Sequence, residues 1–219
     1  MDELIRIFNP HVGHLVKKLM SNSSSYLLDN RSLAEFKKDI KSGHQTEAEI
    51  AVRLCITIKG ETDKWPTLVP FGIDFAGDFV KNVNFDKVNK QDYLINNQKI
   101  EITHSNFLVK RYFHQKVGKI LKAIEDKSIL IFVNGYKEHS IPEYLWLNNI
   151  EIQKYTDLAM KKFGKVGMPS RTGVIANKLA FRYDTQWFDG MWQQLPEIPK
   201  SAISDEKIPK EYIKLLANF

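Results

Sequence analysis

Two short apolar segments on either side of an asparagine turn constrain the fold of this chain most. The first leads into Asn96-Asn97-Gln98, a turn signal, and in the second apolar and polar side chains alternate. The apolar residues of the two segments are Tyr93, Leu94, Ile95, Ile100 and Ile102. This pattern predicts a β-hairpin over residues 91–103. Glu101 and Thr103 then share the opposite face of its second strand.

Helices and one strand are predicted before this hairpin. Apolar residues at helical spacing indicate short helices over residues 10–20 and 32–40. Thr46 and Glu49 have the spacing of a capping box, which predicts a third helix from about residue 47 to 58. Residues 71–80 predict a strand in which glycines permit bulges.

After the hairpin, residues 107–124 carry apolar side chains at helical spacing and predict a helix with a solvated basic face. That face holds Lys110, Arg111, His114, Lys119 and Lys122. The apolar run at 128–133 predicts a fully buried strand. In the last third we expect a strand and a helix within 143–160, a loop at 165–173, an aromatic-rich segment at 181–192 and a short helix within 207–219.

Composition limits the class of protein. A chain of 219 residues suits one domain, and its net charge of +6 suits a nucleic-acid ligand. The single cysteine, Cys55, allows no internal disulfide and lies between apolar neighbours, which predicts a buried thiol and a cytoplasmic protein. The longest apolar run, Ile129–Val133, is too short to span a bilayer, and the N-terminus has no signal-peptide pattern.

Asp92 and Glu101 are the residues most suggestive of chemistry. A turn centred near Asn97 sets Asp92 roughly opposite Glu101, and cross-strand neighbours lie about 5 Å apart. Two carboxylates at that distance repel unless a cation lies between them. Mg²⁺ suits such a pair, because it binds through one or two carboxylates together with water and substrate phosphate.

These residues and their order resemble the PD-(D/E)XK nuclease superfamily. The run from Ile100 to Asn106 is similar to type II restriction endonucleases of the branch that replaces the motif lysine with glutamine, in which Asp also precedes Glu by nine positions. The resemblance covers about residues 46–133, the expected core of a single nuclease domain over 1–219. It implies an α/β fold with a central mixed β-sheet flanked by helices, and a last third that carries recognition or dimer contacts.

The resemblance also implies an activity: Mg²⁺-dependent, sequence-specific cleavage of double-stranded DNA that leaves 5′-phosphates. Asp92 and Glu101 would hold the metal, Thr103 would position the water or the phosphate, and Glu49 (or Glu47) would add a ligand or orient a water. Asn106 would support the site. A palindromic target would require a two-fold homodimer. Candidate contacts to phosphates or bases are Asn106, Lys110, Arg111, Arg171 and Lys178.

One departure from the family pattern keeps alternatives open. The usual motif lysine is Thr103 here, and a hydroxyl supplies no positive charge. Lys99 or Lys110 would then fill in, or His104 would act as a base, or the site is degenerate. Asp74 and Asp78 form a second acidic pair that could hold the metal instead. The alternative functions are a structure-directed repair or junction nuclease and a non-catalytic DNA-binding protein.

Overall fold

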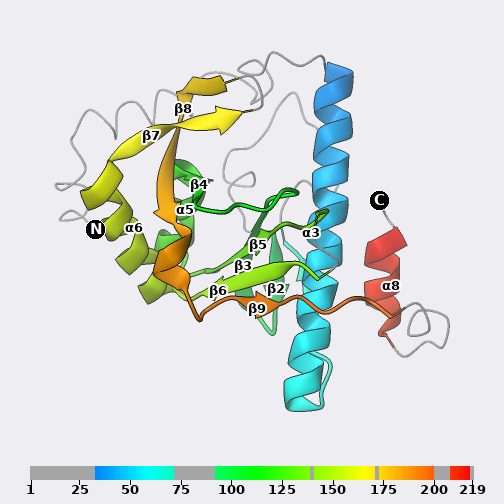
Figure 1. Ribbon diagram of the computed structural model, residues 1–219. Coiled ribbons are helices and arrows are strands. Elements are labelled where there is room, and N and C mark those ends of the chain that lie inside the picture. The colour runs from blue at the N-terminus through cyan, green and yellow to red at the C-terminus, as the bar shows by residue number, and fades with distance from the viewer. Residues whose placement is uncertain (1–32, 72–91, 139–140, 171–172, 200–207, 218–219) are drawn as a thin grey trace.

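The computed structural model describes residues 33–71, 92–138, 141–170, 173–199 and 208–217 (Figure 1). Within these ranges the chain forms an α/β fold with four α-helices, a six-stranded mixed sheet and a small three-stranded sheet. The expected class, a central mixed sheet flanked by helices, is confirmed at this level. Of the helices in these ranges, none is long and apolar enough to cross a membrane.

The larger sheet contains the predicted hairpin. Its strand order is β1 (Leu68–Pro70), β2 (Tyr93–Ile95), β3 (Gln98–His104), β5 (Ile129–Asn134), β6 (Glu143–Leu147) and β9 (Gln193–Gln194). β3 and β5 are parallel, whereas the other neighbouring strands of this sheet are antiparallel. The crossover from β3 to β5 contains α5 (Val117–Glu125), as a parallel pair requires.

The smaller sheet is antiparallel and lies to one side. Its order is β4 (Tyr112–Lys116), β8 (Gly173–Asp184) and β7 (Lys165–Ser170). The remaining elements are α3 (Leu33–Thr62), α6 (Asn149–Phe163), the 3-10 helix η3 (Thr185–Phe188) and α8 (Lys210–Ala217). Figure 1 shows α6 and the small sheet on one side of the molecule, and α3 and α8 on the other.

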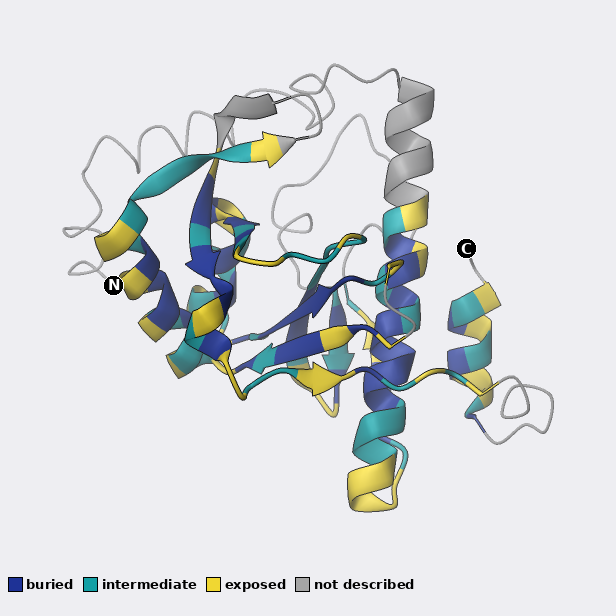
Figure 2. Ribbon diagram, in the orientation of Figure 1, coloured by how far each residue is buried: buried dark blue, intermediate teal, exposed yellow. Residues whose placement is uncertain are grey.

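Hydrophobic cores lie on both faces of the six-stranded sheet. Along β5, Ile131 and Val133 pack into a core shared with α3 and α8, and that core includes the buried Cys55. Leu130 and Phe132 point the other way, into a core shared with α5, α6 and the small sheet. Burial on both faces explains the uninterrupted apolar run of this strand (Figure 2).

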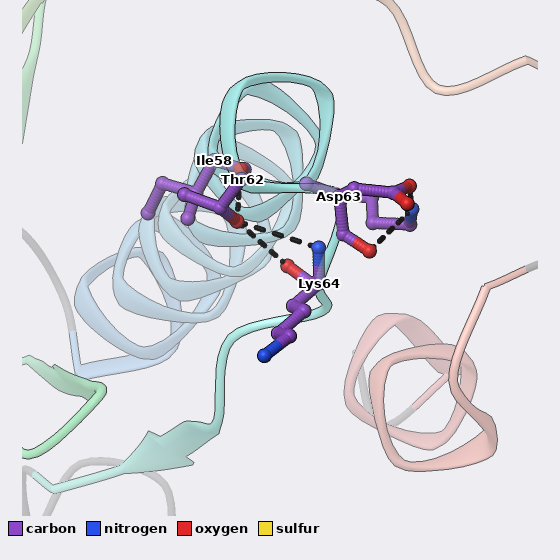
Figure 3. A network of polar contacts seen from close by, with 5 residues as sticks. Ile58, Thr62, Asp63 and Lys64 are labelled. Carbon is purple, nitrogen blue, oxygen red and sulfur yellow. Dashed lines mark hydrogen bonds and ion pairs between the residues drawn. The ribbon is translucent and has the colours of Figure 1, made fainter.

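The structure corrects the prediction of separate helices at 32–40 and 47–58. Both segments belong to one helix of 30 residues, α3. Thr46 is inside that helix and not at its N-terminus, since its hydroxyl donates to the Ser42 carbonyl at 3.0 Å. The capping-box prediction is therefore wrong: a threonine hydroxyl inside a helix bonds one turn back. The exposed end of α3 is shown in Figure 3, where the Thr62 hydroxyl donates to the Ile58 carbonyl at 2.7 Å.

The helix predicted over 107–124 is wrong in its first half and confirmed in its second. Helix begins only at Val117, and residues 112–116 form β4. The ring of Phe113 stacks on Phe132 at 4.1 Å and on Tyr183 at 5.1 Å between centroids. Pairing of β4 with β8, a strand distant in sequence, overrides the local helical spacing.

In the last third, β6, α6 and α8 confirm the predicted strand and helices. The loop predicted at 165–173 is wrong, because residues 165–170 form β7. Pairing with β8 extends this segment despite its glycine and proline. The predicted helix at 10–20 and nearly all of the predicted strand at 71–80 lie outside the described residues.

Candidate active site

The hairpin brings Asp92 and Glu101 together as predicted. Tyr93 pairs with Ile100, and continuing this register by one residue sets Asp92 opposite Glu101. The turn residues Asn96 and Asn97 have φ of 50° and 64°. Asparagine tolerates this left-handed backbone, which two-residue hairpin turns require. The turn chemistry therefore fixes the register that aligns the two carboxylates.

Both carboxylates are held in place. The Asp92 Oδ2 accepts a hydrogen bond from the Ile102 amide at 2.6 Å. Glu101 is buried, with 6% of its surface exposed, and its Oε1 lies 2.5 Å from the Nζ of Lys119 on α5. Glu101 faces α5 because it alternates with Ile100 and Ile102, which pack into the α3 core. The site therefore has two carboxylates and an ammonium group at the end of the hairpin.

Carboxylates dominate the electrostatics of this site. Burial raises the pKa of Glu101 to about 7, with Asp92 adding to the rise and Lys119 opposing it. Burial alone would lower the pKa of Lys119, but Glu101, Asp92 and Glu47 outweigh it and raise that pKa. Lys119 thus keeps its charge among three carboxylates. The remaining excess of negative charge favours a cation at this point.

Glu47 and Glu49 are placed differently. Glu47 and Lys119 both line a pocket at this end of the hairpin, and Glu47 raises the pKa of the Lys119 ammonium. The Glu49 carboxylate accepts a hydrogen bond from the hydroxyl of Tyr136, the residue that follows β5 by two positions. Of the two, Glu47 is the one that acts electrostatically on Lys119, the partner of Glu101.

Thr103 follows Glu101 by two positions on β3 and lines the same pocket. Its hydroxyl accepts a hydrogen bond from the Gln115 Nε2 at 2.9 Å and donates to the Ile131 carbonyl at 3.4 Å. Gln115 is itself buried. This arrangement fixes Thr103 against β4 and leaves the positive charge of the site to another residue.

Lys119 provides that charge, and the sequence prediction missed it. Lys99 pairs with Asp126 at 3.5 Å, away from the carboxylates. Lys110 is exposed in the loop before β4, where its carbonyl accepts from the Thr185 hydroxyl. The sequence pattern predicts a solvated helix face for Lys119, but its ammonium lies against Glu101 in the middle of β3.

His104 also lines the pocket, although it alternates with Thr103 along β3. Burial lowers the pKa of His104 to about 4, and Lys119 and Lys137 add to the effect. The imidazole is therefore neutral near pH 7 and can accept a hydrogen bond. Its ring meets Tyr136 edge-on, with 6.3 Å between centroids.

A pocket of about 430 Å³ opens beside these groups. Its volume falls in the range of small-molecule sites. β3, β4, α5 and β7 supply most of its lining. The lining residues that bear on the chemistry are Glu47, Thr103, His104, Tyr112, His114, Gln115 and Lys119.

The structure describes some of the predicted DNA contacts but not others. Asn106 follows β3, and its buried Oδ1 has no hydrogen-bond partner among the described residues. Lys110 and Arg111 are exposed beside the small sheet rather than on a helix. Arg171 lies outside the described residues, and so does the side chain of Lys178, whose backbone belongs to β8.

The carboxylates of this site are candidate ligands for a divalent metal. Over the described ranges no cluster of three or more His, Cys, Asp or Glu side chains suits a metal ion. The pair Asp92 and Glu101 still fits Mg²⁺, which binds through one or two carboxylates and completes its shell with water and phosphate. The alternative pair, Asp74 and Asp78, lies outside the described residues.

Comparison of the chain with models of known protein families, with curated proteins and with solved structures found no match.

Proposed function

We propose that this chain is a Mg²⁺-dependent endonuclease that hydrolyses DNA phosphodiester bonds and leaves 5′-phosphates. The observation that carries the proposal is the meeting of Asp92, Glu101 and Lys119 at one end of the hairpin, beside a pocket. Paired carboxylates with a nearby ammonium are what phosphoryl chemistry needs: ligands for a divalent cation and a positive charge for a phosphate oxygen.

The order of elements supports the proposal. α3, β1, β2, β3, α5 and β5 follow one another as the resemblance to PD-(D/E)XK nucleases implies. The departure is β4, which is inserted between β3 and α5 and belongs to the small sheet. That insertion brings Gln115 to Thr103 and so rebuilds the surroundings of the motif position.

The chain's residues divide the work of the reaction. Asp92 and Glu101 would hold Mg²⁺, which supplies charge stabilisation on phosphate and a lower pKa for water. Lys119, which pairs with Glu101, would donate to a phosphate oxygen. His104 lines the same pocket, and its lowered pKa keeps the imidazole neutral near pH 7, so it would accept a hydrogen bond from the attacking water and orient it.

The bond changes balance as a hydrolysis. The oxygen of water forms a bond to phosphorus, the bond from phosphorus to the 3′ oxygen breaks, and that oxygen leaves as a hydroxyl after taking up a proton. The products are a 5′-phosphate and a 3′-hydroxyl. For a palindromic duplex we propose a homodimer, because the symmetry of the protein then matches that of the target.

Long phage DNA tests this function directly. With the wild-type chain and Mg²⁺ we expect discrete bands on a gel, and with EDTA we expect intact DNA. A smear in Mg²⁺ would show that the chain hydrolyses DNA without sequence specificity. It would favour the structure-directed alternative. Intact DNA under both conditions, repeated with branched and methylated substrates, would overturn the proposal and leave the non-catalytic DNA-binding alternative.

A further inference from the structure

Cations and aromatic rings alternate in a series of contacts that begins at β4 and crosses β8, the middle strand of the small sheet. This cation–aromatic strip consists of Arg111, Tyr112, Arg182, Phe163, Lys162 and Trp187. The guanidinium carbon of Arg111 lies 4.8 Å from the ring centroid of Tyr112. That of Arg182 lies 5.5 Å from the rings of both Tyr112 and Phe163. The strip is a continuous series of contacts from β4 across β8 to the end of α6 and η3.

The second half of the strip is built in the same way. The Nζ of Lys162 lies 5.2 Å from the ring centroid of Phe163 and 5.4 Å from that of Trp187. The rings of Phe163 and Trp187 stack at 6.0 Å between centroids. Three cations are thus held against three rings that contact one another. Such side chains lose less conformational freedom on binding than free surface lysines do.

The strip is continuous with the candidate active-site pocket. Tyr112 belongs to both, since it lines the pocket and carries Arg111 and Arg182. His114 also lines the pocket, and its Nε2 accepts a hydrogen bond from the Arg182 Nε at 3.2 Å. A polymer whose reacting bond lies in the pocket would therefore reach the strip over a short path.

The charge of the strip is only partly balanced. Lys162 pairs with Asp184 at 3.4 Å, whereas Arg111 and Arg182 form no ion pair with any described residue. Stacking occupies the face of a guanidinium and leaves in-plane N–H donors available. Arginines that lack a carboxylate and are fixed by rings match a polyanion, because phosphate oxygens accept bonds from such donors.

We propose that the cation–aromatic strip binds the sugar–phosphate backbone of the DNA that leads into the pocket, with Arg111 and Arg182 contacting phosphates. This rests on the proposed function for the identity of the polymer, but the binding step needs no cleavage. It assigns to β4, β8 and α6 a role that the nuclease-like core does not supply.

Salt-dependent binding tests the strip. Anisotropy of a fluorescein-labelled 20-base-pair duplex is measured in EDTA over a series of salt concentrations, so that cleavage plays no part. Each of Arg111→Ala, Arg182→Ala and Lys162→Ala is expected to weaken binding roughly 3- to 10-fold at moderate salt. Each should also reduce the slope of log K against log salt by about 1, because one phosphate contact is lost.

Lys64→Ala serves as the matched control, since Lys64 is exposed at the distant end of α3 (Figure 3). Thermal melting checks that each variant is folded. Because Arg182 contacts two rings and His114, the exposed Arg111 keeps the test decisive if Arg182→Ala does not fold. Folded Arg111→Ala and Lys162→Ala proteins with wild-type affinity and slope would overturn the proposal.

The two proposals fail separately. If wild-type protein cuts DNA in Mg²⁺ while the strip variants bind as tightly as wild type, the strip assignment is wrong and the nuclease proposal stands. If binding in EDTA depends on the strip but no DNA is cut in Mg²⁺, the strip assignment stands and the nuclease proposal is wrong.

Discussion

Asp92→Asn is expected to lower the rate of DNA cleavage by a factor of about 1,000 or more, because divalent metal ions supply several kcal/mol of transition-state stabilisation. In EDTA the free energy of unfolding of this variant should lie within about 1 kcal/mol of the wild-type value. Asparagine still accepts the bond from the Ile102 amide, and the weaker bond is offset by relief of repulsion with Glu101. Cleavage of supercoiled plasmid and thermal melting measure the two effects.

Asp63→Asn is the control for removing one carboxylate. Asp63 is exposed at the end of α3 and pairs only locally with Lys59, so its loss should leave cleavage unchanged. Mg²⁺ should raise the melting temperature of wild type and Asp63→Asn but not of Asp92→Asn. Wild-type cleavage by folded Asp92→Asn would show that the metal site has been misplaced.

Lys119→Met is expected to reduce cleavage by a factor of about 100 to 1,000, which is typical for losing one preorganised donor to a developing negative charge. Methionine keeps the length of the side chain but removes the charge beside Glu101. In EDTA the free energy of unfolding should fall by about 1–3 kcal/mol, because Glu101 is left buried without its partner. The lower end is expected, since Glu101 can take up a proton.

Lys122→Met on the same helix separates a role in the site from a general loss of charge. Lys122 lies 3.5 Å from Glu125 and 3.3 Å from Asp126, near the C-terminal end of α5. Such exposed pairs contribute about 0–1 kcal/mol. Lys122→Met should therefore cut DNA at the wild-type rate. Equal losses in both variants would mean that Lys119 acts only through the net charge of α5.

The hairpin could be predicted from sequence because its determinants are local. Two asparagines set the turn, and alternation of Ile100 and Ile102 with Glu101 sets the faces. The position of Asp92 opposite Glu101 follows from these short-range rules. The buried strand β5 could also be predicted from sequence, because its apolar run is what burial on both faces requires.

The small sheet and Lys119 could not be predicted in the same way. Residues 112–116 have helical spacing, and only pairing with residues 180–184 makes them a strand. A basic residue on the polar face of a helix is solvated in most proteins, and nothing near Lys119 in sequence shows that β3 places Glu101 beside it. Its partners depend on how α5 packs on the sheet, which spacing alone does not reveal.

Direct measurement of metal binding tests the central claim, that Asp92 and Glu101 together hold a divalent cation. Mn²⁺ in place of Mg²⁺ allows the free ion to be counted by electron paramagnetic resonance as protein is added. Wild type and Asp63→Asn are predicted to bind Mn²⁺, and Asp92→Asn and Glu101→Gln are predicted to bind far less. Equal binding by all four folded proteins, or by none of them, would contradict the assignment of the metal to this pair.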